Sequence, residues 1–355
     1  MRQKCHHRGI RVLFLSGFLF FLTGCSGRKT QSDILCDLDI TSLGLTVSDI
    51  TTDDTLYTFV SEYPVEINYW DKKMYVILHD ADSLACVIST VTREVEERLG
   101  ATGQGPDDVN SLEFYANAPT LAEKPQLVDC NSGKIFSPDS NGTYRMDKLP
   151  VAWVSPLNKF GDKFVGKKAG RQNTFFSIFD KDGTILRDIE YPFSLKESTK
   201  SKIHGRDYIL SPYIFANKER GRIIAAMYFA DAAFVYDSIG NLITTISIGT
   251  EKDIDKMLRT VTDNQPYWRY RGGCATDKSC FMRLSRYIAD LDNMEMSPEK
   301  SILLEFDWSG NVHKVYKMEE DIVAFCIDRD RTIWALKRTI HDDDEHYHVL
   351  HQRLN

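Results

Sequence analysis

Four Asp-x-x-Gly segments, each following a short apolar run, constrain the fold of this chain more than any other sequence feature. An Asp side chain closes a local turn by accepting backbone hydrogen bonds, and Gly supplies the positive φ that such a turn requires. Apolar runs joined by turns of this kind are typical of antiparallel β-hairpins. The four segments are Asp139–Gly142, Asp180–Gly183, Asp237–Gly240 and Asp307–Gly310.

A second kind of turn, short and charged, precedes apolar strands and alternates with the first kind. Examples are Asp71–Lys73, Gly161–Lys163 and Asp328–Asp330. The two kinds recur roughly every 40–70 residues, near the period of propeller blades. We therefore predict an all-β fold, a six-bladed β-propeller of four-stranded antiparallel blades. The last unit is one strand short, and we expect an N-terminal strand near Leu56–Val60 to complete it and close the ring.

The first 25 residues form three consecutive zones. Residues 1–11 contain four basic residues and no acid. Val12–Leu22 is an apolar run that would be about 16 Å long as a helix, too short for a hydrocarbon core of about 30 Å. Leu22-Thr23-Gly24-Cys25 then places small residues before a cysteine, which resembles the lipobox of bacterial lipoproteins. The alternative is an ordinary secretory signal in which Cys25 is incidental.

The lipobox resemblance implies cleavage after Gly24, diacylglycerol on the Cys25 sulfur and an acyl chain such as palmitate on the new amine. We therefore expect a signal peptide over residues 1–24, a lipidated tether over 25–33 and the propeller domain over 34–355. Several acyl chains would anchor the protein durably, since each buried methylene contributes about 0.8 kcal/mol. The expected location is the bacterial cell envelope, on the outer membrane; the sequence leaves the periplasmic or surface orientation open.

The lipobox, the Asp-x-x-Gly turns and the segment Gly103–Asp107 together resemble the Bacteroidetes TolB-like six-bladed β-propeller lipoproteins. That family commonly has a Gly-x-Gly-Pro segment followed by an acid and an aromatic residue. Here Asp107 and Asp108 supply acids, but Val109 stands where the aromatic is expected. The resemblance covers nearly the whole chain after Cys25 and implies the fold and the envelope location, with no established chemistry. The segment lacks the Gly-Lys-Ser/Thr ending of a P-loop, so we predict a crossover between blades.

The charge balance narrows the class of partner. Removal of residues 1–24 takes away four positive charges and no negative ones, so the net charge falls from −7 to −11. An acidic balance argues against nucleic acid as the partner.

The cysteines after Cys25 show no Cys-x-x-Cys pair and no Cys/His metal spacing. Most lie in apolar runs, where buried free thiols are expected. Cys274 and Cys280 are the exception, because they flank the turn at Asp277-Lys278. A three-residue loop would place them opposite each other, and a two-residue loop would leave them diagonal. We hypothesise a cross-strand disulfide between them, subject to the restricted geometry of that bond.

A cluster of aromatic and basic residues lies in the longest insertion, between Gly249 and Gly272. Tyr267, Trp268, Arg269 and Tyr270 are residue types favoured at binding hot spots. They are candidates for a ligand face that stacks on sugars or binds a peptide. The alternative is that they pack over the edge of a blade.

His341–His348 is the segment richest in candidate metal ligands, because His and carboxylates bind zinc or calcium. It lies between two strand-like runs, so we predict a solvent-exposed hairpin and expect no metal or cofactor. The chain contains no Gly-x-Ser-x-Gly nucleophile elbow. The favoured function is a non-enzymatic binding or scaffold module for an unknown protein, peptide or glycan. The alternative is a hydrolase or lyase that uses a divalent cation at the central channel.

Overall fold

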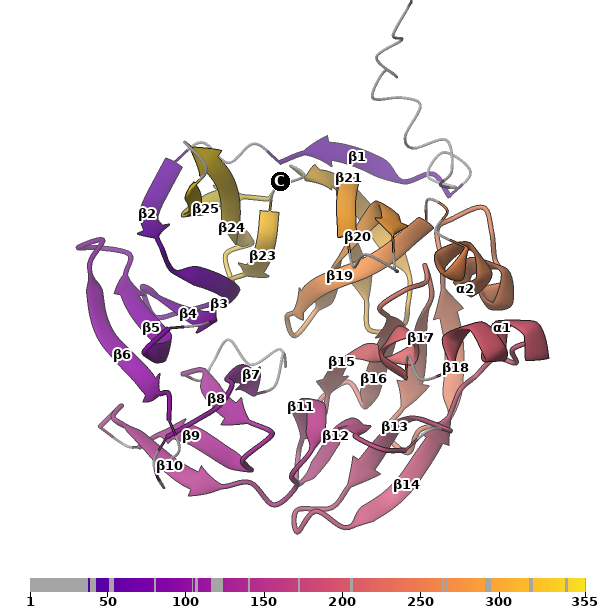
Figure 1. Cartoon of the computed structure of the whole chain (residues 1–355), viewed down its shortest axis with the longest axis horizontal. Helices are drawn as coiled ribbons and strands as arrows, with labels where there is room; N and C mark the ends of the chain where they lie inside the picture. Colours follow the sequence, from indigo (N-terminus) through magenta and orange to yellow (C-terminus); the bar gives the residue numbers. More distant parts are fainter. Residues whose placement is uncertain are drawn as a thin grey trace, which may run out of the picture. The chain divides into compact units, whose positions relative to one another are not determined.

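Six antiparallel sheets surround a central channel, as Figure 1 shows, and this confirms the predicted six-bladed β-propeller. The computed structural model describes residues 38, 43–50, 54–79, 81–103, 105, 108–115, 124–139, 141–171, 173–204, 207–263, 265, 267–290, 295–318, 322–341 and 344–354. Gly24 and Cys25, with the predicted signal peptide and tether, lie outside the described residues. No helix within the described part of the chain is long and apolar enough to cross a membrane.

In blades 1 to 4 the strands follow one another in chain order from the channel outward, and in blades 5 and 6 an N-terminal strand is added at the outer edge. Blade 1 consists of β3 (Tyr63–Trp70), β4 (Lys73–His79), β5 (Ser83–Ser89) and β6 (Val95–Ala101). Blade 2 consists of β7 (Glu113–Tyr115), β8 (Gln126–Asp129), β9 (Lys134–Pro138) and β10 (Tyr144–Lys148). Blade 3 consists of β11 (Val154–Phe160), β12 (Lys163–Lys168), β13 (Thr174–Phe179) and β14 (Ile185–Glu190). Blade 4 consists of β15 (Pro212–Asn217), β16 (Arg222–Met227), β17 (Ala233–Asp237) and β18 (Leu242–Ile246). Blade 5 consists of β19 (Tyr267–Ala275), β20 (Ser279–Asp290), β21 (Glu295–Asp307) and β22 (Val312–Met318). Blade 6 consists of β23 (Ile322–Ile327), β24 (Thr332–His341), β25 (Asp344–Arg353) and β2 (Asp54–Val60).

The predicted ring closure is confirmed by β2. It pairs antiparallel with β25 and supplies the fourth strand of blade 6, and β3 of blade 1 follows it directly. A further strand, β1 (Thr46–Asp49), pairs parallel with β22 and adds a fifth strand to blade 5. The sequence pattern does not predict β1, because a single parallel edge strand carries no hairpin turn of its own.

The Asp-x-x-Gly turns join the third and fourth strands of blades 2 to 5, as hairpins. In the turn between β13 and β14, Asp180 Oδ1 accepts hydrogen bonds from the backbone N–H groups of Asp182 and Thr184, at 3.0 and 2.8 Å. Gly183 occupies φ +84°, a conformation that side chains disfavour. Asp237 and Asp307 accept the same pair of bonds in blades 4 and 5. The local chemistry expected for these turns is therefore confirmed.

The core lies mainly between the faces of neighbouring blades. In the largest cluster, Phe176 of β13 packs edge-on against Tyr236 of β17, with ring centroids 5.0 Å apart and both side chains buried. Two helices, α1 (Glu197–Ile203) and α2 (Ile254–Thr262), and the short 3₁₀ segment η2 (Asp207–Leu210) accompany this part of the ring. Burial of these aromatic faces fixes each blade against the next.

The inner strands β3, β7, β11, β15, β19 and β23 line the channel (Figure 1). We call the end of the channel where the inner strands begin the entry face. In each antiparallel blade the second strand ends on this face. β6 of blade 1 and β7 of blade 2 are consecutive strands, and Gly103 and Gly105 of the predicted crossover lie between them in the chain. Gln104 and Pro106 lie outside the described residues.

Candidate ligand-binding site

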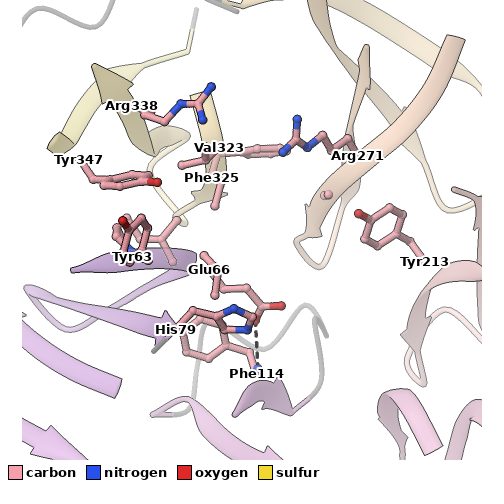
Figure 2. A pocket seen from close by; sticks show the side chains of 16 residues that line it. Tyr63, Glu66, His79, Phe114, Tyr213, Arg271, Val323, Phe325, Arg338 and Tyr347 are labelled. Atoms are coloured by element: carbon pink, nitrogen blue, oxygen red, sulfur yellow. Dashed lines mark hydrogen bonds between the residues drawn. The ribbon is translucent and has the colours of Figure 1, made fainter. Parts of the chain in front are cut away.

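A cavity of about 490 Å³ lies at the entry face of the central channel, and we call it the channel cavity. It is lined from blades 1, 2, 4, 5 and 6, and its size falls within the range of small-molecule sites. Figure 2 shows its polar lining. The charged and polar side chains are Glu66, His79, Arg271, Arg338, Tyr63, Tyr213 and Tyr347.

Four of the six inner strands contain a shift of pairing register, in three of them near the strand's first residues and in β19 near its middle. The pairing register shifts at Val65 in β3, at Ser155-Pro156 in β11, at Arg271-Gly272 in β19 and at Val323 in β23. A β-bulge bends its strand and re-aims a side chain, and bulges are over-represented beside active sites. Three of the four shifts, those at Val65, Arg271-Gly272 and Val323, thus lie in the lining of the channel cavity.

The bulge in β19 explains the position of Arg271. Tyr270 pairs with Leu284, and Gly273 pairs with Met282, so two residues of β19 face one residue of β20. Gly272 takes φ +79° to make this bulge. A side chain at Gly273 would collide with the Phe281 carbonyl oxygen, 2.6 Å from an added Cβ. The glycine pair therefore lets Arg271 point into the channel cavity, toward Phe325 (Figure 2).

Glu66 is the acidic group of the cavity. Its Oε2 accepts a hydrogen bond from the backbone N–H of Phe114, at 3.2 Å (Figure 2). Burial, together with the nearby Glu113 carboxylate, raises the pKa of Glu66 to about 7, against the opposing effect of this hydrogen bond. Burial also raises the pKa of Glu113, whose two carboxylate oxygens each accept from Ser155 Oγ at 2.9 Å. Two carboxyl groups with raised pKa values thus lie next to one another along the channel.

Arginine and tyrosine side chains form the rest of the wall. Arg338 Nη1 donates to Glu345 Oε1 at 3.3 Å, and Tyr347 donates its hydroxyl to the other Glu345 oxygen at 2.6 Å. Tyr213 packs on Tyr228 with ring centroids 4.1 Å apart. These contacts fix the orientation of side chains that a ligand would meet, which reduces the entropy lost on binding.

The structure corrects the predicted ligand face at Tyr267, Trp268, Arg269 and Tyr270. Tyr267, Arg269 and Tyr270 are buried, and none of the four lines a cavity described here. Tyr270 donates its hydroxyl to the buried Asp231 carboxylate at 3.2 Å, and Arg269 lies 4.9 Å from the ring of Phe229. The aromatic residues of this run therefore serve packing, and the next residue, Arg271, reaches the cavity.

The hypothesised disulfide between Cys274 and Cys280 is not formed, and both thiols are free. The register of β19 and β20 gives the reason. Cys274 pairs with Phe281, and Cys280 pairs with Ala275, so the two sulfurs lie on opposite faces of the sheet. Cys86, Cys130 and Cys326 are buried free thiols, as predicted.

The segment around His341 forms the predicted hairpin, since His341 pairs with Asp344 across the turn between β24 and β25. Within the described residues, no group of three or more His, Cys, Asp or Glu side chains is arranged to hold a metal ion.

Sequence reasoning did not identify Glu66, Glu113, Arg271 or Arg338 as residues of the channel. A usable signal existed for one of them, because the doublet Gly272-Gly273 inside a strand-like run is typical of a bulge. For the others, the direction of the side chain depends on register shifts that the local sequence does not reveal.

No family model matches this sequence, and no curated protein matches it. Solved structures resemble the chain over most of its length. A member of the DUF4221 family from Bacteroides vulgatus has a TM-score of 0.53 at 7% identity, over 86% of this chain and 99% of that chain. A Bacteroides fragilis protein whose name calls it exported has a TM-score of 0.49 at 10% identity, over 87% of this chain and 99% of that chain. Virginiamycin B lyase from Staphylococcus aureus has a TM-score of 0.40 at 14% identity, over 82% of this chain and 99% of that chain. At such identities likeness concerns the fold alone.

Proposed function

We propose that this protein is a binding module whose channel cavity takes a small polar ligand with an acidic group. The observation that carries the proposal is that groups of opposite charge, Glu66 and Arg271, line one cavity and are positioned by bulged inner strands. A guanidinium binds a carboxylate through two parallel hydrogen bonds. A hydroxyl or ammonium group of the same ligand would face Glu66.

Replacing Arg271 with alanine is expected to weaken binding of such a ligand at least tenfold, because the ligand's acidic group loses its charged partner. The measurement is thermal unfolding of the full chain in mild detergent, with a panel of amino acids, dipeptides and uronic acids as probes. A probe present at about 100 times its Kd stabilises the wild type by about 2.7 kcal/mol. A tenfold weaker Kd should reduce this stabilisation in Arg271→Ala by about 1.3 kcal/mol, and a larger loss of affinity should reduce it more.

The matched control is Arg353→Ala, which removes an exposed arginine of β25 that lines no cavity described here. It should respond to each probe as the wild type does. If no probe stabilises the wild type, or if both variants respond alike, the channel cavity is not the binding site.

The proposal also includes a cellular location: the protein would be an envelope lipoprotein, similar to the TolB-like propeller lipoproteins and anchored through Cys25. The basic start, the short apolar run and the small residues before Cys25 support it. Leu38 pairs with Gly249 beside β18, so the propeller begins 13 residues after Cys25. Even fully extended, that connection reaches only about 45 Å, so an anchor on Cys25 would hold the propeller near the membrane.

Changing Cys25 to serine is expected to move the protein from the membrane fraction to the soluble fraction of a bacterial host, because the thioether to diacylglycerol cannot form. The measurement is fractionation with immunodetection, together with mass spectrometry of the N-terminal peptide. Cys36→Ser is the control and should stay with the membrane. A wild-type N-terminal peptide without lipid mass would contradict the anchor.

A further inference from the structure

A second cavity, of about 340 Å³, opens on the entry face between blades 2, 3 and 4, and we call it the Trp153 cavity. Its lining includes Asn131, Trp153, Ser155, Lys168 and Tyr208. It borders the channel cavity at β7, because Glu113 lines the Trp153 cavity and the next residue, Phe114, lines the channel cavity.

Trp153 is exposed although its backbone is held rigidly. The side chain is 59% exposed, which is unusual for so large an apolar group. Its φ is +58°, a region that bulky residues rarely occupy. The conformation is held because its N–H donates to the Cys130 carbonyl at 2.9 Å and its carbonyl accepts from Ala169 N–H at 2.8 Å. Residues kept in such conformations cluster at ligand-binding positions.

A second aromatic ring lines the same cavity. Tyr208 of η2 is 46% exposed, and its ring rests edge-on against buried Phe229, with centroids 5.7 Å apart. The contact holds the ring in place while leaving much of it open to solvent. Two oriented, exposed rings on one cavity offer flat stacking surfaces.

The charge of this cavity is opposite to that of the protein. Lys167, Lys168 and Arg171 line it, against Glu113 alone, whereas the whole chain carries a net charge of −7. Arg171 pairs with Asp188, and Lys167 donates to the Tyr191 hydroxyl at 2.7 Å. Lys168 has no ion-pair or hydrogen-bonding partner for its side chain among the residues that the structure describes. A local positive charge in an acidic protein attracts an anionic ligand.

We propose that the Trp153 cavity binds an acidic oligosaccharide. A pyranose ring has an apolar face of C–H groups, which would stack on Trp153 or Tyr208, and a rim of hydroxyl groups, which would meet Asn131 and Ser155. A carboxylate or sulfate on the sugar would lie near Lys168. A peptide fits less well, because its anchors require closed apolar pockets, whereas this cavity presents two exposed rings beside polar side chains. The site is separate from the channel cavity and does not depend on the function proposed for it.

The test is calorimetric titration of the full chain in mild detergent with four probes. These are trigalacturonate, a chondroitin sulfate tetrasaccharide, neutral maltotriose and hexaglutamate peptide. The wild type should bind one or both acidic sugars, more weakly at high salt, and should bind maltotriose and hexaglutamate far less tightly. Trigalacturonate carries carboxylates alone, and chondroitin sulfate carries both carboxylates and sulfates, so binding of the second sugar alone would indicate that a sulfate is required.

Trp153→Ala should weaken binding of the acidic sugar about 10- to 100-fold, in line with the strength of aromatic stacking. Trp153→Tyr should recover most of it, and Lys168→Ala should weaken the acidic sugars while leaving any binding of maltotriose unchanged. Arg353→Ala, which removes an exposed arginine outside both cavities, should bind them as the wild type does. Thermal unfolding checks that each variant is folded, and Trp153→Gly, which suits the positive φ, replaces Trp153→Ala if that variant is not.

Three outcomes would overturn the proposal. The acidic sugars do not bind the wild type, or they bind the Trp153 variants equally well, or hexaglutamate binds as tightly with the same dependence on Trp153. The last result would identify an acidic peptide as the ligand.

Discussion

Replacing Phe176 with alanine is expected to lower the free energy of unfolding by about 3–5 kcal/mol. Phe176 is fully buried between blades 3 and 4, where its ring packs edge-on against Tyr236. The change removes the ring from a closely packed interface and leaves a cavity that the two sheets cannot collapse to fill, because each is held by its own ladder of hydrogen bonds. The variant therefore loses buried apolar area and also contacts between blades 3 and 4.

Urea unfolding followed by circular dichroism measures this loss as a lower midpoint. Leu186→Ala is the matched control, since Leu186 lies in β14 of the same blade and is 52% exposed. Its expected change is within about 0.5 kcal/mol. A Phe176→Ala variant as stable as Leu186→Ala would mean that the interface between blades 3 and 4 contributes little to the stability of the ring.

The architecture was predictable because its turns carry local chemistry. Asp180 and Gly183 determine their hairpin through bonds within five residues of chain, and such turns recur in blade after blade. They occur in four of the six blades, and their alternation with the short charged turns indicates about six units. Closure by β2 followed from a missing strand in the last unit together with the cost of an open edge.

The candidate site was less predictable, because it depends on contacts between residues far apart in the chain. The run Tyr267–Tyr270 has the composition of a binding surface, yet its rings fill the interior around Asp231 and Phe229. Arg271 reaches the channel only because a bulge interrupts the alternation of β19. A one-residue change of register moves a side chain to the other face of a sheet, and this same sensitivity separates the sulfurs of Cys274 and Cys280.

The exposure of Trp153 likewise could not be predicted from the local sequence. Its sequence neighbours, Val151 to Val154, are typical of a buried strand, and Val151 and Val154 are indeed buried. The exposed ring between them results from a positive φ held by carbonyl and amide groups of Cys130 and Ala169. Those partners belong to two different blades, so no window of local sequence contains the cause.

Replacing Glu66 with glutamine is expected to raise the free energy of unfolding by about 2 kcal/mol at pH 8 and to leave it unchanged at pH 4. The folded-state pKa of Glu66 is about 7, against an ordinary value of 4.5. The proton bound to folded Glu66 stabilises the wild type fully below pH 4.5, and that stability is lost as the pH rises through 7. Each pKa unit of difference between the folded and unfolded states corresponds to about 1.4 kcal/mol of stability. Partial exposure of the Glu66 side chain lowers the stability change that the full pKa difference would give.

Glutamine cannot ionise and can still accept the hydrogen bond from Phe114, so the variant avoids the cost of a buried carboxylate without losing a contact. Glu94→Gln serves as the control, because Glu94 is exposed and should give the wild-type pH profile. The measurement is urea unfolding at half-unit intervals from pH 4 to pH 8. A constant difference between Glu66→Gln and wild type across this range would show that Glu66 ionises in the folded protein as it does in water. In that event the channel cavity would be hydrated well enough to hold a carboxylate at neutral pH. A ligand bearing an ammonium group would then meet a full negative charge on Glu66 at every pH tested above 5.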